Sequence, residues 1–416
     1  MKIADGVYVH FIPTQKYKTN RIVFRMTGSL NKQTIAKRAL VSQMLATANQ
    51  TYPTVQSFKE RLAFLYGTQL STRVSTKGLT HSVDIELTYL KDTFIPTNDG
   101  LFWEVLGFLK ECLYKPLSRV AQYQNKVFDI EKQNLKTYLD VDTENNYYYS
   151  EVKGRELYFV NEGLKVPKYG QAELVEAETS FTAYQEFQSM LTRDRIDIFI
   201  VGEFDDYQVL QALHRFPLEG RQVDLQFSYS QPYVNVVKEK IEPRQSSQSI
   251  LQLGYQFPCQ YGDKDYFALI VFNAMFGEFA HSALFTTLRE KEGLAYSISS
   301  QFDIFTGLLE VYAGIEKSNR DQAMRGISRE LNYIKLGRFS SSLLNQTKKI
   351  IRMNALLSED HALTLVEQRF NKVIFGDKSL SLENWLDEIE KVTKKDVCRV
   401  ARQVKLQSLF FLEGVS

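Results

Sequence analysis

The first half of the chain opens with two segments in which apolar and β-branched residues predominate. Residues 7–13 and 21–26 have this composition and are separated by a lysine-containing stretch, which is typical of two strands joined by a turn. Apolar residues then recur at every fourth position from Ala36 to Met44, and this spacing predicts a helix over 35–48. The helix would turn this apolar stripe toward a core.

The later apolar patterns predict further groups of helices and strands. In the first half we expect a helix at 58–65, strands at 69–75 and 82–90, helices at 101–113, 120–138 and 183–191, and a closing strand at 196–201. In the second half we expect a strand at 249–255, helices at 266–276 and 283–292, strands at 297–305 and 308–313, helices at 320–336, 340–357 and 394–402, and a closing strand at 409–412.

The two halves resemble each other in detail. The segment FKERLAFLYGTQLS aligns with LFTTLREKEGLAYS at a constant offset of 226, which places Gly67 on Gly293 at the end of a short helix, where a left-handed backbone is expected. The segments VDIEL and LEVYA align at the same offset. Chance similarity between two α+β segments is the alternative, but repetition at half the chain length indicates tandem duplication rather than a solenoid.

The duplication predicts two similar domains of α+β class, each an antiparallel sheet flanked by helices. We expect an N-terminal domain over 1–215 and a C-terminal domain over 249–416. Residues 216–248 are polar and carry three prolines, which favours a linker between the domains that contains one strand.

Composition narrows the class of function. The 416 residues are 44% hydrophobic and 24% charged, as in ordinary soluble proteins. With 51 Lys and Arg against 49 Asp and Glu, the net charge of +2 gives no basic stripe for nucleic acid. Three scattered cysteines form no disulfide framework, and no apolar run has the length of a membrane span or a signal peptide. We therefore expect a cytoplasmic protein that neither binds nucleic acid nor crosses a membrane.

The segment FTTLREKEGLAYSISS, residues 285–300, is the most informative in the chain. A helix ends in charged residues, turns at Gly293 and continues as a strand, so that Arg289 and Tyr296 flank the turn. A guanidinium beside a phenol can bind a peptide carbonyl or stabilise a developing oxyanion. The alternative is a surface arginine paired with Glu292 or Glu290 and a tyrosine at an interface.

This segment resembles the second-half signature of the pitrilysin/insulinase family of metallopeptidases, which includes the mitochondrial processing peptidases. The resemblance covers nearly the whole chain and implies the processing-peptidase-like metallohydrolase fold, which LuxS shares. In that family the second half supplies an Arg-x6-Tyr pair that reaches substrate bound near the zinc of the first half. By this resemblance Arg289 would hold the substrate carbonyl and Tyr296 would assist transition-state stabilisation.

The zinc motif of that family, H-x-x-E-H on the first-half helix, does not occur in this sequence. The resemblance places Ala39 and Gln43 at the two histidine positions and Ser42 at the position of the general base. It places Tyr138 at the last zinc ligand on a later helix. Alanine and tyrosine are not credible zinc ligands here and glutamine is a poor one. We therefore expect no metal on this chain.

These observations imply the zinc-free subunit of a two-chain metallopeptidase. The chain would be inactive alone, would pair with an H-x-x-E-H homologue that carries zinc, and would supply Arg289 and Tyr296 to the processing of a peptide substrate. A homodimer of the isolated chain would imitate the working pair. The alternatives are a peptide-binding or scaffold protein of peptidase fold without a catalytic role, and an active enzyme with an unrelated site.

Overall fold

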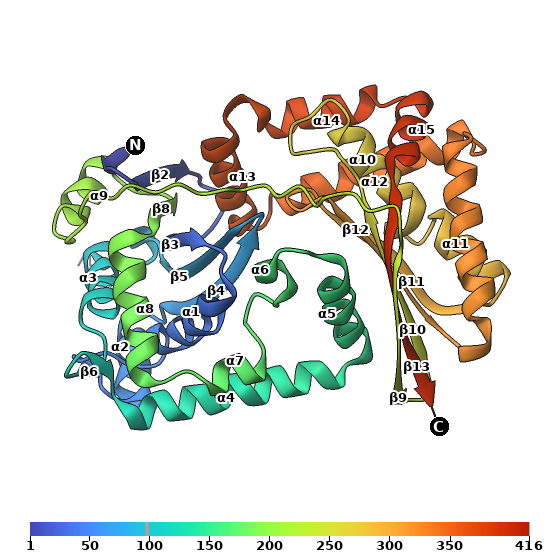
Figure 1. The fold of residues 1–416 in the computed structure, drawn as a ribbon. Helices are drawn as coiled ribbons and strands as arrows, with labels where there is room; N and C mark the ends of the chain where they lie inside the picture. Colours follow the sequence, from blue (N-terminus) through green and yellow to red (C-terminus); the bar gives the residue numbers. More distant parts are fainter. Residues whose placement is uncertain (96–99, 416) are drawn as a thin grey trace. The chain divides into compact units, whose positions relative to one another are not determined.

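A computed structural model describes residues 1–95 and 100–415, and their packing divides the chain into two compact units (Figure 1). Unit 1 comprises Met1–Val141, Val166–Gln226 and Leu365–Arg369. Unit 2 comprises Asp142–Lys165, Phe227–Thr364 and Phe370–Ser416. Each unit thus includes a segment from the other half of the sequence, and residues 216–248 divide between the units at Gln226.

Unit 1 is built on a six-stranded sheet in the order β1-β2-β8-β3-β5-β4, in which only β2 and β8 run parallel. The strands are β1 Lys2–Ala4, β2 Val7–Pro13, β3 Thr19–Ser29, β4 Gln69–Lys77, β5 Thr80–Leu90 and β8 Arg195–Gly202. The helices are α1 Lys32–Leu45, α2 Val55–Phe64, η1 Asp92–Phe94, α3 Leu101–Tyr114, α4 Asn125–Glu144, α7 Ala172–Glu176, α8 Ser180–Arg193 and α9 Asp206–Leu213. The last three residues of α4 belong to unit 2.

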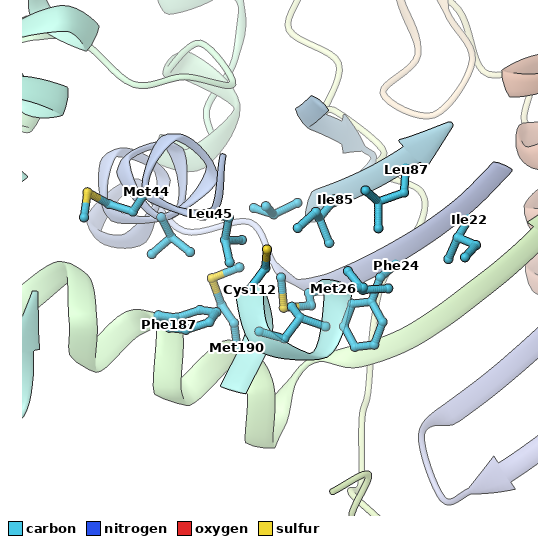
Figure 2. Packing of buried hydrophobic residues seen from close by; sticks show 14 of the residues in the cluster. Ile22, Phe24, Met26, Met44, Leu45, Ile85, Leu87, Cys112, Phe187 and Met190 are labelled. Atoms are coloured by element: carbon cyan, nitrogen blue, oxygen red, sulfur yellow. The ribbon is translucent and has the colours of Figure 1, made fainter. Parts of the chain in front are cut away.

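The core of unit 1 lies between this sheet and helices α1, α3 and α8. Figure 2 shows Phe24 and Met26 of β3 facing Leu45 of α1, Cys112 of α3 and Met190 of α8. All five side chains are buried. The apolar stripe predicted on α1, which consists of Ala36, Leu40 and Met44, is buried in the same core.

Unit 2 is built on a five-stranded sheet in the order β11-β12-β10-β13-β9, in which only β13 and β9 run parallel. The strands are β9 Lys238–Gln245, β10 Ser249–Gln256, β11 Ala295–Asp303, β12 Leu308–Ile315 and β13 Lys405–Val415. The α-helices are α5 Asn146–Tyr158, α6 Glu162–Lys165, α10 Tyr266–Asn273, α11 Arg320–Lys335, α12 Ser341–Ser358, α13 Ala362–Phe375, α14 Leu382–Lys391 and α15 Lys394–Gln403. Two π-helical segments, η2 Ala274–Glu278 and η3 Phe285–Lys291, and two short turns, η4 Lys317–Asn319 and η5 Gly376–Lys378, complete the unit.

The two sheets share one topology, which confirms the α+β class and the two similar domains. The order β2-β8-β3-β5-β4 in unit 1 corresponds strand for strand to β9-β13-β10-β12-β11 in unit 2. The parallel pair occupies the same place in both sheets, so each sheet is mixed rather than wholly antiparallel. The strand expected within the linker is β9, and it completes the second sheet. None of the helices among residues 1–95 and 100–415 combines the length and the apolar character needed to cross a membrane.

The predicted helix at 120–138 is wrong at its beginning. Val120 and Ala121 have φ values of 53° and 57° and form a tight turn between two short strands, β6 Ser118–Arg119 and β7 Gln122–Tyr123. Two successive left-handed residues are typical of a hairpin turn and exclude a right-handed helix. Neither residue belongs to the types that favour this turn, which explains why the pattern predicted a helix.

The sequence analysis did not predict helix α5, which has no apolar stripe of helical period and is stabilised by its packing against β10 and β13. Helix α5 carries Gly154 in its interior, where a Cβ atom would lie 2.6 Å from the side chain of Gln252 on β10. The close approach of α5 to the sheet therefore requires glycine, although glycine disfavours an isolated helix. The other unpredicted helices are α6, α7, α9, α13 and α14.

Candidate functional site

The predicted helix at 283–292 is present, but its residues Phe285–Lys291 form a π-helix, η3, rather than an α-helix. The amide of Glu292 donates to the carbonyl of Thr287, five residues earlier, at 2.9 Å. Leu288 is fully buried and anchors η3 in the core of unit 2. Gly293 ends the segment with φ +62°, the left-handed conformation that its position predicts. Wide turns of this kind occur often at functional sites.

Arg289 lies on the exposed side of η3. Its guanidinium carbon lies 4.6 Å from the centre of the Phe285 ring, within the range of a cation–π contact. Glu292, one of the two carboxylates considered as its partner, pairs instead with Arg329 at 2.5 Å. Among the described residues no carboxylate lies within ion-pair distance of Arg289, so its N–H donors are available to a ligand.

Tyr296 lies in a β-bulge at the start of β11, an edge strand of the second sheet. Ala295 lies opposite Ile315 and Ser297 lies opposite Gly314, so Tyr296 is the extra residue between them. Its side chain is 59% exposed. Bulges re-aim a side chain and are frequent beside active sites.

The Tyr296 hydroxyl donates to a carboxylate oxygen of Glu316 at 2.9 Å. This hydrogen bond raises the pKa of Tyr296 above its usual value, so the phenol keeps its proton at neutral pH. A protonated phenol can donate to an oxyanion. Sequence reasoning missed Glu316, although the hairpin pairing of β11 with β12 puts it next to the bulge.

The structure does not join Arg289 and Tyr296 by a direct hydrogen bond within the described residues; each has its own partner. Both are exposed, and η3 leads through Gly293 into the beginning of β11. A guanidinium and a phenol at one end of an edge strand can bind the carbonyl oxygen of an extended peptide. Sequence reasoning also missed Phe285, which stands four residues before Arg289 on the same helix.

In unit 1, three of the positions that the family resemblance assigns to zinc chemistry lie on α1. Ala39 and Ser42 are 1% and 4% exposed and belong to the interior. The side-chain oxygen of Gln43 is buried and has no hydrogen-bond partner among the described residues. This face of α1 therefore presents a methyl group, a hydroxyl and an amide.

The fourth position, Tyr138 on α4, is half exposed and packs edge-to-face against Tyr169 with ring centres 6.0 Å apart. The next residue, Gly170, lies so close to α1 that a Cβ atom there would be 3.3 Å from Cα of Ala36. The segment Tyr169–Gly170 thus contacts both α4 and α1.

These residues do not fit a zinc ion, because alanine supplies no donor and the remaining groups are weak ligands. Across residues 1–95 and 100–415, no group of three His, Cys, Asp or Glu side chains could hold a metal ion. His81 is fully buried, and burial lowers its pKa to about 3, so the ring is neutral and bonds to the carbonyl of Lys168 at 2.8 Å. Burial raises the pKa of the Cys259 thiol to about 12, which argues against a nucleophilic role.

A buried charge cluster lies on the face of the first sheet opposite His81. Arg25, 1% exposed, makes two 2.8 Å hydrogen bonds to the carboxylate of Asp84. Arg73 bonds to the same carboxylate at 2.8 Å. Glu367, from the part of α13 that belongs to unit 1, accepts from Arg25 at 2.5 Å and from Lys77 at 3.4 Å. The neighbouring cations, Arg25 foremost, lower the pKa of Glu367 to about 2 against the opposing effect of burial.

The second sheet carries a buried carboxylate at the corresponding position. Glu310 stands 226 residues after Asp84 and is 5% exposed. The amides of Gln252 and Gln301 donate to it at 3.3 and 3.4 Å, and Arg155 of α5 lies 3.7 Å away. Burial is the largest cause that raises the pKa of Glu310 to about 7.

Comparison with known proteins supplies independent evidence. Residues 184–351 match the family model described as the peptidase M16 inactive domain. The chain is 30% identical over 410 residues to the probable inactive metalloprotease YmfF of Bacillus subtilis, covering 98% of this chain and 96% of that protein.

Solved structures agree with this similarity. A conserved protein from Enterococcus faecalis V583 is 36% identical, with a TM-score of 0.97 over 100% of this chain and 98% of that chain. The peptidase M16 inactive domain from Pseudomonas fluorescens is 15% identical, with a TM-score of 0.79 over 99% of this chain and 97% of that chain. At that identity the second likeness concerns the fold alone.

Proposed function

This chain belongs to the M16 peptidase family as an inactive, peptidase-like member, and from that premise we propose that it is the zinc-free subunit of a two-chain metallopeptidase. One contrast carries the proposal. Unit 2 has Arg289 and Tyr296 exposed around a bulged edge strand, whereas in unit 1 the buried Ala39 occupies a position that the family resemblance assigns to a zinc ligand. A chain with the substrate-binding half of the chemistry and without the metal half requires a partner with an H-x-x-E-H motif.

In this proposal the partner supplies zinc and the hydrolytic step, and this chain binds and orients the peptide. The Arg289 guanidinium, stacked on Phe285, donates to a carbonyl oxygen of the substrate. The Tyr296 hydroxyl leaves Glu316 and donates to the same carbonyl as negative charge develops on its oxygen. The substrate lies as an added strand, whose backbone groups pair with a free sheet edge such as that of β11.

The test is peptidase activity on an unstructured peptide, measured for the chain alone, for an H-x-x-E-H homologue alone and for the two co-expressed. We expect activity in the co-expressed pair to exceed that of either chain. Arg289→Ala and Tyr296→Phe should each lower kcat of the pair by about 100-fold, the usual cost of losing one oxyanion donor. Arg325→Ala and Tyr207→Phe, at other exposed sites, serve as matched controls that leave kcat unchanged.

A second function is a scaffold or peptide-binding protein without a catalytic role. It is favoured by the fact that Arg289 and Tyr296 already have partners within this chain, Phe285 and Glu316. In that case the chain would form a stable complex with the partner, but neither Arg289→Ala nor Tyr296→Phe would change the peptidase activity of the complex. Activity of the isolated chain with stoichiometric zinc would contradict both functions.

A further inference from the structure

Helix α5 of unit 2 packs on the second sheet with a small apolar contact. Successive residues of β10 and β12 point to opposite sides of the sheet, one side toward the main core of the unit and the other toward α5. The apolar part of the α5 contact consists of Ile250, Phe410 and Leu412, packed against Tyr147, Tyr149 and Leu157. A helix of 13 residues is marginal on its own in water, so α5 depends on this contact to stay helical.

Glu310 of β12 is buried on the side of the sheet that α5 covers. The two residues that flank it belong to the main core, so its own side chain points to the other side. It is 5% exposed, and Arg155 of α5 lies 3.7 Å from its carboxyl group. The amides of Gln301 and of Gln252, which lies against Gly154 of α5, donate to it at 3.4 and 3.3 Å. Charge-assisted hydrogen bonds are shorter, about 2.7 to 2.9 Å, so these distances suit a neutral carboxyl group.

The charged and titratable groups that face Glu310 come from α5 and β11, and they are Glu151, Arg155, Tyr158 and Asp303. Two of them are carboxylates and one is a guanidinium, so ionisation of Glu310 adds a third negative charge beside a single cation. Burial is the largest cause that raises the pKa of Glu310 to about 7. Burial also raises the pKa of Tyr158, which therefore keeps its proton.

We propose that α5 is a strap that is held against the second sheet while Glu310 carries its proton and is released when Glu310 ionises. Release exposes the carboxylate to water, where its charge is no longer costly. It also breaks the 2.6 Å hydrogen bond between the Tyr147 hydroxyl of α5 and Ser297, the residue that follows Tyr296 in the bulge. The strap thus makes the order of the bulge depend on pH. The proposal holds whether or not the chain acts with a peptidase partner.

The direction of the pH effect follows from the two states of the strap. When α5 is released, the pKa of Glu310 returns toward 4.5, and when α5 is docked it is about 7. The docked state therefore retains a proton that the released state loses. Release becomes more frequent by up to about tenfold per pH unit between pH 4.5 and 7, and levels off above pH 7, where both states have lost the proton.

Amide hydrogen exchange of the full-length chain at pH 5, 6, 7 and 8, compared between α5 and β12, tests the proposal. Protection factors, which divide out the intrinsic pH dependence of exchange, report the opening of each element. We expect the protection of α5 to fall by up to about tenfold per pH unit from pH 5 to 7 and to stay constant from pH 7 to 8. The strand β12 should be better protected than α5 throughout, because its sheet hydrogen bonds survive release of the strap. Glu310→Gln, which cannot ionise, should abolish the fall in protection.

Glu242→Gln is the matched control, because Glu242 of β9 accepts a hydrogen bond from Tyr149 of α5. Burial opposes ionisation of Glu242, but this hydrogen bond and Lys240 lower its pKa, so it stays ionised from pH 5 to 8. Its replacement should weaken the strap equally at each pH and leave the fall in protection in place. If Glu310→Gln fails to fold, the wild-type comparison of α5 with β12 decides. Constant protection of α5 between pH 5 and 7, an unchanged fall in Glu310→Gln, loss of the fall in Glu242→Gln, or equal protection of α5 and β12 at every pH would overturn the proposal.

Discussion

Each unit contains a helix that ends at a glycine and is followed by a strand: α2, Gly67 and β4 in unit 1, and η3, Gly293 and β11 in unit 2. The two segments have the same order of elements but differ in local geometry. In unit 1, α2 is a regular α-helix and β4 pairs with β5 without a register shift. In unit 2, η3 is π-helical and β11 begins with a bulge. The positions of Arg289 and Tyr296 correspond, at the offset of 226, to Ala63 and Leu70. The two units thus share one topology, but the π-helical turns of η3 and the bulge at Tyr296 occur only in the segment of unit 2. These two features change the directions of the Arg289 and Tyr296 side chains.

The buried carboxylates Asp84 and Glu310, which stand at corresponding positions of the two sheets, also differ, in this case in their charged and polar neighbours. Asp84 has guanidinium partners, whereas Glu310 has two amide donors and a more distant arginine. The same strand position therefore holds a fully paired charge in unit 1 and a carboxyl group that favours its proton in unit 2. The two tryptophans, Trp103 in unit 1 and Trp385 in unit 2, allow the two units to be followed separately.

The largest effect is expected from breaking the charged pair of unit 1. Arg25→Ala leaves Asp84 with one guanidinium partner in a buried site, which should cost about 3 to 5 kcal/mol of unfolding free energy. Urea unfolding followed by Trp103 fluorescence, in a Trp385→Phe background, measures it.

The matched change in unit 2 is Gln252→Ala, followed by Trp385 fluorescence in a Trp103→Phe background. It removes one hydrogen bond to Glu310 and should cost only about 1 kcal/mol. Equal losses from Arg25→Ala and Gln252→Ala would contradict the distinction between a paired charge and an amide-solvated carboxyl.

The next effect concerns pH and the carboxyl of Glu310. Folding raises its pKa from 4.5 to about 7, so the folded state keeps a proton that the unfolded state releases. Stability should therefore fall as pH rises from 4.5 to 7, by up to about 3 kcal/mol, and level off above. Glu310→Gln should remove this slope, so that the variant gains on wild type between pH 5 and 8 in Trp385-detected unfolding. Arg155 on α5 limits the shift, and Glu151 and Asp303 enlarge it.

Glu367→Gln is the control for Glu310→Gln, because the pKa of Glu367 is lowered whereas that of Glu310 is raised. Its pKa is lowered from 4.5 to about 2, so its stabilising charge is fully present above 4.5 and is lost as pH falls toward 2. Between pH 6 and 8 the cost of Glu367→Gln should stay constant, in contrast to the changing effect of Glu310→Gln. A changing cost in that range would show that the two carboxyls do not differ as described.

A smaller loss of unfolding free energy, of the same size at both positions, is expected when Gly67 or Gly293 is replaced by alanine. Gly67 and Gly293 have φ values of +71° and +62°, and a Cβ atom at either would meet no atom within 4 Å. Alanine at each should therefore cost only the left-handed backbone penalty, about 1 to 2 kcal/mol. Single-tryptophan unfolding of the two variants measures both values, and a much larger loss at one site would reveal an unequal role for the turns.

The smallest loss of unfolding free energy is expected when the hydrogen bonds of Tyr147 beside the bulge at Tyr296 are removed. The Tyr147 hydroxyl of α5 forms hydrogen bonds with Ser297, the residue after Tyr296, at 2.6 Å and with Gln248 at 3.2 Å. Tyr147→Phe should cost about 0.5 to 1.5 kcal/mol and speed amide hydrogen exchange at the start of β11. Exchange that is unaffected there would show that the bulge does not depend on α5.

The sequence predicted most of the fold because local patterns and the repeat agree. The turns at Gly67 and Gly293 and the strand pair VDIEL and LEVYA follow from spacing alone. The bulge at Tyr296 and the π-helical turns of η3 could not be predicted, since they depend on how β11 pairs with β12 and how Leu288 seats in the core. The roles of Arg289 and Tyr296 stay predictions.

Long-range charge pairing was equally invisible in the sequence. Glu367 is 342 residues from Arg25, and no local pattern connects them. The hairpin at Val120 and Ala121 was missed because neither residue is of a type that normally adopts a left-handed turn.

The exchange of segments between the halves of the chain limits how the protein can be dissected. A fragment ending at Gln226 would retain Arg25, Arg73 and Lys77 but would lose Glu367, and so would carry buried cations in excess of their anions. A fragment beginning at Phe227 would lack α5, which covers β10 and β13. Limited proteolysis or gene truncation at the midpoint should therefore yield insoluble pieces, and a workable bisection of this polypeptide would have to supply each missing piece as a separate peptide.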